Sequence, residues 1–358
     1  MNRLASIWRD LTEGHSIGAL WLDFKREARS SFESTAPRLS PAGVEVRGWR
    51  RLWLFARAMF FSLTPARRVL SLVAVLMLFS FSTGSDPRAQ VDSGGGPFLA
   101  AVCLLVVLFL EVADRVAMKR DLEVARDIQN WLVPQSPPQL PGIDIAFATR
   151  PANTVAGDYY DVLSLPAGGV LLVVADVAGK GIPAGILMAS FRSSLHTLAG
   201  TTRDLSDLMS RLNRSCFADS YGGRHYTTVF LAEYSTATGS IAYINGGHNP
   251  PLLRDSSGSL TQLEIGGVPC GTFPDATYEI GYLTAGPGDL LLIYNDGVVE
   301  AVNDAGDEYG LDRLRAFVRE TAGSSASLQQ RLFTSIEAFA GRTPQRDDIT
   351  CMVVQITG

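Results

Sequence analysis

The stretch VLLVVADVAGKGIPAGI, residues 170–186, decides how the chain folds. It begins with six apolar residues that do not alternate with polar ones, a pattern typical of a strand buried on both faces. Asp176 follows this predicted strand directly. Gly179, Lys180 and Gly181 then form a loop to which the two glycines give flexibility, and a helix is predicted over 183–198. A carboxylate is thus expected at the end of a buried strand, beside a flexible loop.

Further aspartates occupy similar positions at the ends of predicted strands. Asp158 and Asp161 lie in the motif AGDYYD, Asp296 follows the apolar run LLLIYN, and Asp347 and Asp348 stand directly before the last strand. A carboxylate at the end of a buried strand must be paired, hydrogen-bonded or bound to a metal. If several such ends meet, their oxygens would suit Mg²⁺ or Mn²⁺. Taken singly, an Asp-Gly after a strand is more often a turn, and spacing alone does not show that these ends converge.

The C-terminal part, residues 142–358, is predicted to hold mainly strands, with helices in two blocks. Helices are expected over 183–198, 205–220, 311–320 and 328–339. Strands are expected over 143–150, 159–165, 169–175, 227–234, 240–245, 251–254, 260–264, 278–283, 290–294 and 349–356. Because strands and helices do not alternate regularly, the pattern predicts an α+β fold and not a doubly wound sheet.

The composition excludes several classes of protein. Hydrophobic residues make up 46% of the 358 and charged residues 19%, so the chain has the material for a core. Residues 121–358 carry 15 basic and 26 acidic side chains, which argues against nucleic acid as a partner, because phosphate contacts need clustered cations. The four cysteines have no CxxC spacing, so neither a disulfide framework nor a thiolate zinc site is indicated.

Two uncharged apolar runs, residues 69–85 and 94–110, predict a transmembrane hairpin of two helices. Each has 17 residues, the short end of what a helix needs to cross a bilayer, and neither shows a polar face. A pair of buried core helices is the alternative. Arginines flank the outer ends of both runs and the connecting loop is nearly neutral, so the positive-inside rule places both termini in the cytoplasm. The expected location is the cell (inner) membrane, with the C-terminal domain on the cytoplasmic side.

A predicted helix over 112–133 leads from the second span to the C-terminal domain, and prolines from Pro134 onward end it. Its apolar seam from Met118 to Leu132, interrupted by Gln129, could pair two copies of the chain as a homodimer or pack on the domain. The predicted organisation is a basic cytoplasmic segment, the hairpin, a helical linker and the C-terminal domain, over 1–68, 69–110, 111–141 and 142–358.

Five motifs, in order, resemble those of the metal-dependent protein serine/threonine phosphatases (PPM-type), in the bacterial SpoIIE/RsbU-like branch. They are AGDYYD, DVAGKGIPA, NGGHNPP, NDGVVEA and DDIT, beginning at residues 156, 176, 245, 295 and 347. The similarity runs from about residue 122 to residue 358 and leaves the hairpin outside it. It implies a four-layer α/β/β/α sandwich with two or three Mn²⁺ or Mg²⁺ ions at one edge of the paired sheets.

The resemblance also implies roles for the residues at the matching motif positions. Asp176 would bridge two metals, the backbone carbonyl of Val177 would be a further ligand, and Asp296 and Asp347 would complete one metal's shell. Asp158 would hold the other side or help to bind an additional metal. Water activated by the cations would attack the phosphate in line, so Asp176 and Asp296 are the predicted catalytic residues.

Other residues have less definite implied roles. Asp161 would be a structural cap or support a ligand, and Asp348 takes a place where related enzymes often have Asn. Arg150 could bind the phosphate, although a plain surface arginine is the simpler interpretation. His248 lies in a motif that looks structural. The loop of Gly179, Lys180 and Gly181 would act as a regulatory switch with the helix behind it.

The leading hypothesis is a membrane-anchored protein phosphatase. By resemblance, its substrate would be a phosphorylated STAS-domain protein of the anti-anti-sigma type, in a partner-switching pathway. The alternative is a catalytically silent, membrane-tethered interaction module of the same fold; the intact aspartates favour the enzyme. A metal-dependent nuclease or nucleotide hydrolase is a third hypothesis, but the sequence lacks a basic groove and a Gly-rich P-loop.

Overall fold

The computed structural model describes residues 53, 57, 60–61, 63–82, 95–165, 169–202 and 204–358. Predictions for the basic segment up to residue 52 and for the loop 83–94 lie outside these residues. The chain divides into two compact units, Met1–Ala117 and Met118–Gly358. Each unit is described by itself below.

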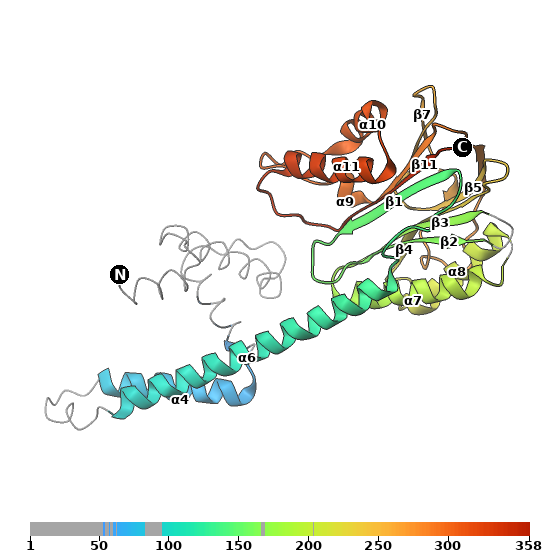
Figure 1. Ribbon diagram of the computed structural model, residues 1–358. Helices are drawn as coiled ribbons and strands as arrows, with labels where there is room; N and C mark the ends of the chain where they lie inside the picture. The colour runs from blue at the N-terminus through green and yellow to red at the C-terminus, as the bar shows by residue number, and fades with distance from the viewer. Residues whose placement is uncertain are drawn as a thin grey trace. The chain divides into compact units, whose positions relative to one another are not determined.

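The C-terminal unit contains two β-sheets (Figure 1). One sheet has the strand order β1-β11-β10-β6-β7, and the other has the order β2-β3-β4-β5-β8, with β9 paired to β5. The strands are β1 (Ile143–Arg150), β2 (Asp158–Ser164), β3 (Val170–Val177), β4 (Thr227–Tyr234), β5 (Ser240–Gly246), β6 (Leu252–Arg254), β7 (Leu260–Gln262), β8 (Gly266–Gly267), β9 (Gly281–Thr284), β10 (Leu290–Tyr294) and β11 (Ile349–Ile356).

Helices cover the outer face of each sheet, which gives four layers. The helices α7 (Ile182–Ala199) and α8 (Leu205–Asp219) cover the β2–β3–β4 sheet. The helices α10 (Gly310–Glu320) and α11 (Ser325–Ala340) cover the sheet that contains β10 and β11. Three apolar clusters fill the spaces between neighbouring layers, one of them between the two sheets. The predicted α/β/β/α sandwich is therefore confirmed.

Strand β3 shows why its sequence does not alternate. Leu172 and Val174 point into the cluster between the sheets, whereas Leu171 and Val173 point into the cluster beneath α7 and α8. All four side chains are at most 1% exposed. Because both faces of this strand are covered, each of its apolar residues is buried.

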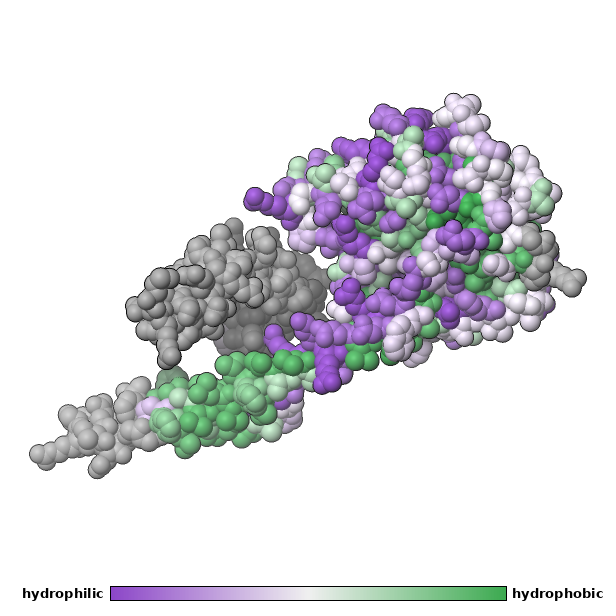
Figure 2. Space-filling view, viewed as in Figure 1, coloured by the Kyte–Doolittle hydropathy of each residue, from purple (hydrophilic) through white to green (hydrophobic). Residues whose placement is uncertain are grey.

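The N-terminal unit contains two apolar helices, α4 (Pro65–Ser82) and the first part of α6 (Gly95–Leu132). The start of α4 is tied to α6 just beyond the apolar run, because Arg67 pairs with Glu111 at 3.1 Å and with Asp114 at 2.7 Å. Figure 2 shows apolar residues gathered over both helices, and Leu76 and Phe109 are 66% and 72% exposed. Among the described residues, Gly96–Leu132 alone forms a helix long and apolar enough to cross a membrane.

The structure adds to or differs from the predicted elements at the following points. The second apolar run and the linker helix form one helix, α6, because no proline follows Pro97 and no glycine follows Gly96 before it ends. Strand β3 continues through Asp176 and Val177, which pair with Thr228 and Thr227 of β4. Asp296 begins a short helix, α9 (Asp296–Val299), which was not among the predicted elements.

Candidate functional site

Aspartates from both sheets meet where β2 and β3 of one sheet lie against the ends of β10 and β11 of the other. Asp158 at the start of β2 stands directly opposite Asp176 in the β2–β3 register. Asn295, at the end of β10, donates from its Nδ2 to Asp158 Oδ2 at 2.8 Å. Asp296 follows Asn295 in the chain and begins α9. The two sheets are therefore joined through the carboxylates that the sequence placed at their strand ends.

Asn295 and Thr350 hold this junction in place. Asn295 also donates to the carbonyl of Asp348 at 2.7 Å, and its own Oδ1 accepts from the Thr350 amide at 2.9 Å. The Thr350 hydroxyl donates to Asp158 Oδ2. Both side chains are buried. Neither Asn295 nor Thr350 was predicted to be part of the site, because their hydrogen-bond partners lie on other strands.

Asp348 ties the loop before β2 to β11. Its two carboxylate oxygens accept from the backbone amides of Ala152 and Gly157, at 2.7 and 2.9 Å. Because both oxygens are engaged in this way, Asp348 is a structural residue of the site and not a free ligand. Gly297 packs against the backbone of Asp348: a Cβ added to Gly297 would lie only 1.9 Å from the Asp348 carbonyl oxygen. Only glycine fits at that position.

Burial and mutual charge repulsion raise the pKa values of three of these aspartates. Burial raises the pKa of Asp158 well above its ordinary value, and the charge of Asp176 raises it further. Burial, with repulsion from Asp296 and Asp347, raises the pKa of Asp176 to about 7. Burial and the charge of Asp347 also raise the pKa of Asp296. These carboxylates repel one another when they are ionised at neutral pH. A bound cation would reduce this repulsion.

Two buried oxygens support the same interpretation, since Asp158 Oδ1 and Asp296 Oδ1 have no hydrogen-bond partner. Buried acceptors without a partner are costly, and all-oxygen donors suit Mg²⁺ and Mn²⁺. The chemistry of the residues therefore fits a divalent cation. Within the described part of the chain, however, no three His, Cys, Asp or Glu side chains are arranged to hold a metal ion as they stand.

Lys180 contacts the cluster from the loop between β3 and α7. Its ammonium group lies 2.7 Å from Asp347 Oδ2 and donates to the Arg346 carbonyl oxygen at 2.8 Å. The loop has two glycines with positive φ, Gly179 at +121° and Gly181 at +71°. The segment predicted to act as a switch is thus in direct contact with a predicted metal ligand.

Gln129 of α6 reaches the loop that leads to Asp158. Its Nε2 donates to the carbonyl of Ala156 at 2.7 Å, and its Oε1 accepts from the amide of Ala156 at 2.9 Å. The side chain is buried. Gln129 interrupts the apolar seam of the linker because its side chain makes this polar contact with Ala156. Ala156 lies two residues before Asp158.

A family comparison agrees with this arrangement. Residues 166–357, more than half of the chain, match the family of Stage II sporulation protein E (SpoIIE). The chain belongs to the SpoIIE family. The matched region contains Asp176, Asp296 and Asp347, and the phosphatase resemblance inferred from the motifs is confirmed at the level of the family.

Individual relatives are more distant from this SpoIIE-family chain. Protein IcfG of Synechocystis sp. is 27% identical over 270 residues, and phosphoserine phosphatase RsbU of Bacillus subtilis is 25% identical over 220 residues. These matches cover 68% and 61% of this chain but only 42% and 65% of the two relatives. The solved SiaA-PP2C domain of Pseudomonas aeruginosa shares the fold, with a TM-score of 0.62 at 19% identity over 68% of this chain and 98% of that domain.

Other predicted residues of the SpoIIE-family domain lie apart from the aspartates or are engaged elsewhere. Asp161 is buried and hydrogen-bonds with Tyr159 Oη at 2.5 Å and His196 Nε2 at 2.7 Å, which joins β2 to α7. Arg150 pairs with Glu337 at 3.5 Å and lies over the Phe333 ring. Its predicted role with phosphate stays a prediction.

His248 is a buried structural histidine. Its Nδ1 hydrogen-bonds with Thr228 Oγ1 at 2.9 Å, and its amide donates to Asn245 Oδ1 at 2.7 Å. Burial lowers the pKa of His248 to about 4. A ring that is neutral at pH 7 lacks the acidic proton of an imidazolium and is therefore a poor general acid.

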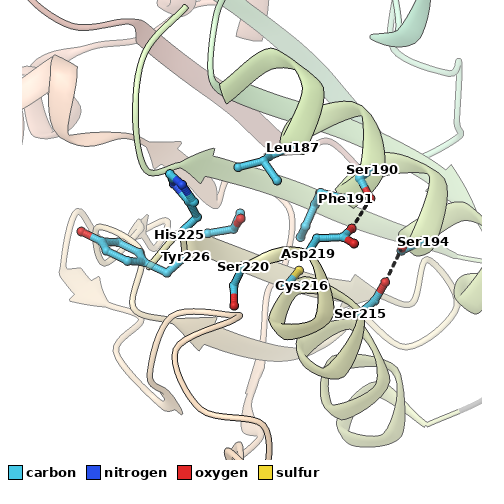
Figure 3. Close-up of a pocket in the computed structure, with 11 residues that line it drawn as sticks. Leu187, Ser190, Phe191, Ser194, Ser215, Cys216, Asp219, Ser220, His225 and Tyr226 are labelled. Carbon is cyan, nitrogen blue, oxygen red and sulfur yellow. Dashed lines mark hydrogen bonds between the residues drawn. The ribbon is translucent and has the colours of Figure 1, made fainter. Parts of the chain in front are cut away.

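Two cavities of the domain differ in their relation to the aspartates. A cavity of about 340 Å³ adjoins Asp347 and Gly297 and is lined by Arg150, Glu300 and Glu337. A second, of about 20 Å³, lies between α7 and α8, where Ser190 contacts Asp219 (Figure 3). It has room for about one water and none of the predicted ligands lines it. Only the first cavity is both next to the carboxylates and large enough for part of a substrate.

Proposed function

We propose that the chain is a metal-dependent phosphatase that removes phosphate from phosphoserine or phosphothreonine in a protein. The observation that carries this proposal is the group of aspartates from both sheets, with raised pKa values and two unpartnered buried oxygens. Membership of the SpoIIE family and similarity to phosphoserine phosphatase RsbU support it.

The residues that would hold divalent cations are Asp158, Asp176, Asp296 and Asp347, with the carbonyl oxygen of Val177. When bound, Mn²⁺ or Mg²⁺ would supply an activated water and positive charge for the phosphate oxygens. Asn295 and Thr350 would orient Asp158 by their hydrogen bonds. Asp348 would keep the loop before β2 in place. The neutral His248 would support the fold without taking part in proton transfer.

The direct test is phosphate release by the purified full chain. We expect release from a phosphorylated STAS-domain protein with Mn²⁺ or Mg²⁺ present, and loss of release when a chelator is added. A small aryl phosphate should be assayed in parallel, because it needs no protein recognition. Metal-dependent turnover of the aryl phosphate alone would reject the STAS substrate, and no turnover of either compound would reject the enzyme.

The alternative is a catalytically silent interaction module of the same fold. It predicts binding of the phosphoprotein without release of phosphate. The raised pKa values argue against it, since repelling carboxylates destabilise the fold and a binding surface has no need of them.

We further propose that α4 and α6 form the predicted two-span hairpin, with the catalytic domain in the cytoplasm. The exposed apolar side chains on both helices support this, and the Arg67 pairs with Glu111 and Asp114 stand where the apolar run of α6 ends. The 18 residues of α4 extend about 27 Å, near the thickness of about 30 Å of the hydrocarbon core.

Membrane insertion predicts that the full chain stays in the membrane fraction after washing with high salt or carbonate, and is released only by detergent. A reporter fused after Gly358 should be active in the cytoplasm. Release by salt alone would argue against spans, and a reporter active only outside the cytoplasm would reverse the topology.

A further inference from the structure

Lys180 forms an ion pair with one carboxylate oxygen of Asp347, a predicted metal ligand. Its Nζ lies 2.7 Å from Asp347 Oδ2, and the other oxygen, Asp347 Oδ1, accepts from the amide of Asp348 at 2.9 Å. The same ammonium donates to the carbonyl of Arg346 at 2.8 Å. The contact joins residues 167 positions apart and both side chains are about half exposed, at 52% and 41%.

We propose that Lys180 is a built-in competitor of the divalent cation for Asp347. The inference rests on the proposed function, because it assumes that Asp347 ligates a metal. Asp347 then has two alternative partners: the ammonium group of Lys180, or the metal. Binding of the metal requires Lys180 to leave, so the Lys180–Asp347 pair raises the concentration of metal at which the site fills.

The position of Lys180 explains why it would act on the whole site and not on Asp347 alone. Burial raises the pKa of Asp296 and of Asp348, and the positive charge of Lys180 offsets part of each rise. Lys180 is therefore a counter-ion to several of the aspartates. A divalent cation beside Asp296 and Asp347 would meet this like charge at short range, which disfavours occupancy of both positions at once.

The loop around Lys180 is built to let the side chain leave. Gly179 and Gly181 have positive φ, and a Cβ on either one would meet no atom within 4 Å. The loop is fixed on both sides, by the hydrogen bond from the Ala178 amide to Tyr226 at 2.9 Å and from the Gly185 amide to Gly181 at 3.1 Å. Movement is thus confined to about three residues, and exposed ion pairs of this kind are weak enough to be exchanged.

The test is the affinity of the purified full chain for Mn²⁺, measured from the electron paramagnetic resonance signal of the free ion. Lys180→Met keeps the aliphatic stem and removes the charge, so we expect the Kd for Mn²⁺ to fall by about threefold to tenfold. Lys180→Arg keeps the charge and should stay within about twofold of the wild type. Lys119→Met removes the same charge from an exposed lysine that pairs with Glu123, and should change nothing.

A second measurement separates competition from damage to the fold. Without metal, Lys180→Met should melt at a lower temperature than the wild type at pH 8, because the aspartates lose a counter-ion; with saturating Mn²⁺ the difference should vanish. If Lys180→Met fails to fold, Lys180→Gln takes its place. An unchanged or weaker affinity in the folded variant would overturn the role of Lys180. No Mn²⁺ binding by the wild type would instead overturn the proposed function.

Discussion

Asp176→Asn is expected to lower phosphate release by at least about 100-fold, because loss of a mere supporting residue around a metal already costs 10- to 100-fold. Asn has nearly the shape of Asp but carries no charge, so it would be a much weaker ligand for the cations that Asp176 is proposed to hold. Asp296→Asn should have a similar effect. The measurement is phosphate release by the full chain at saturating Mn²⁺. Asp312→Asn, which changes a fully exposed carboxylate on α10, is the matched control.

The same Asp176→Asn variant should be more stable than the wild type when metal is absent. The pKa of Asp176 in the folded chain is about 7, against an ordinary value of 3.8. Ionisation of Asp176 therefore destabilises the folded state fully above about pH 7, and this destabilisation shrinks gradually as the pH falls from about 7 toward 3.8. Metal-free Asp176→Asn should melt higher than the wild type at pH 8, by about 2–4 °C for each kcal/mol relieved, with a smaller gap at pH 6.

These two readouts together distinguish loss of chemistry from loss of folding. An inactive variant that melts higher at pH 8 fits a site designed to hold cations. If either folded variant keeps wild-type turnover, the assignment of that aspartate as a ligand is rejected. If Asp176→Asn melts lower at pH 8, the charge of Asp176 does not destabilise the metal-free folded chain, and the premise of this prediction is rejected.

Local patterns in the sequence predicted an α+β fold, because they follow from which faces of each element are covered, whereas the four layers were predicted from the family resemblance. The sequence of strand β3 is apolar on both faces because both faces are covered. The family was predicted from five motifs that occur in order. The residues at which strands and helices end were harder to predict from the sequence. Asp176 lies inside β3 because its neighbours on β2 and β4 extend the ladder, which no property of residues 170–177 reveals.

Contacts between distant segments were out of reach of the sequence. Asn295 and Thr350 are ordinary polar residues until β10, β11 and β2 are brought together, and only then do both side chains meet Asp158. Lys180 and Asp347 meet because a loop of one sheet faces the start of a strand in the other. Gln129 was visible only as a break in an apolar seam, and its partner Ala156 could not be inferred.

Helix α6 links the proposed membrane hairpin to the loop before Asp158, and this makes it a candidate regulator. Gln129 fixes its last turns to Ala156 with two hydrogen bonds. On another face Val124, Ile128 and Trp131 are exposed, Trp131 at 81%. They follow one another at the four- and three-residue steps of a coiled-coil seam. We propose that this stripe pairs two copies of the chain, in place of the seam predicted from Met118 to Leu132.

Insertion of one to four alanines after Arg120 should therefore make phosphatase activity in membranes rise and fall with the helical phase. Each added residue turns the preceding part of α6 by about 100° relative to Gln129 and leaves the contact with Ala156 untouched. One or two alanines should lower the activity by about fivefold or more, the size of a modest coupling free energy, and three or four should restore most of it. The matched control is the same series assayed in detergent at a dilution that keeps the chain monomeric, where the phase should have no effect. Equal activity across the membrane series would show that α6 is only a spacer, because a helix that transmits the state of the hairpin cannot be indifferent to its rotation.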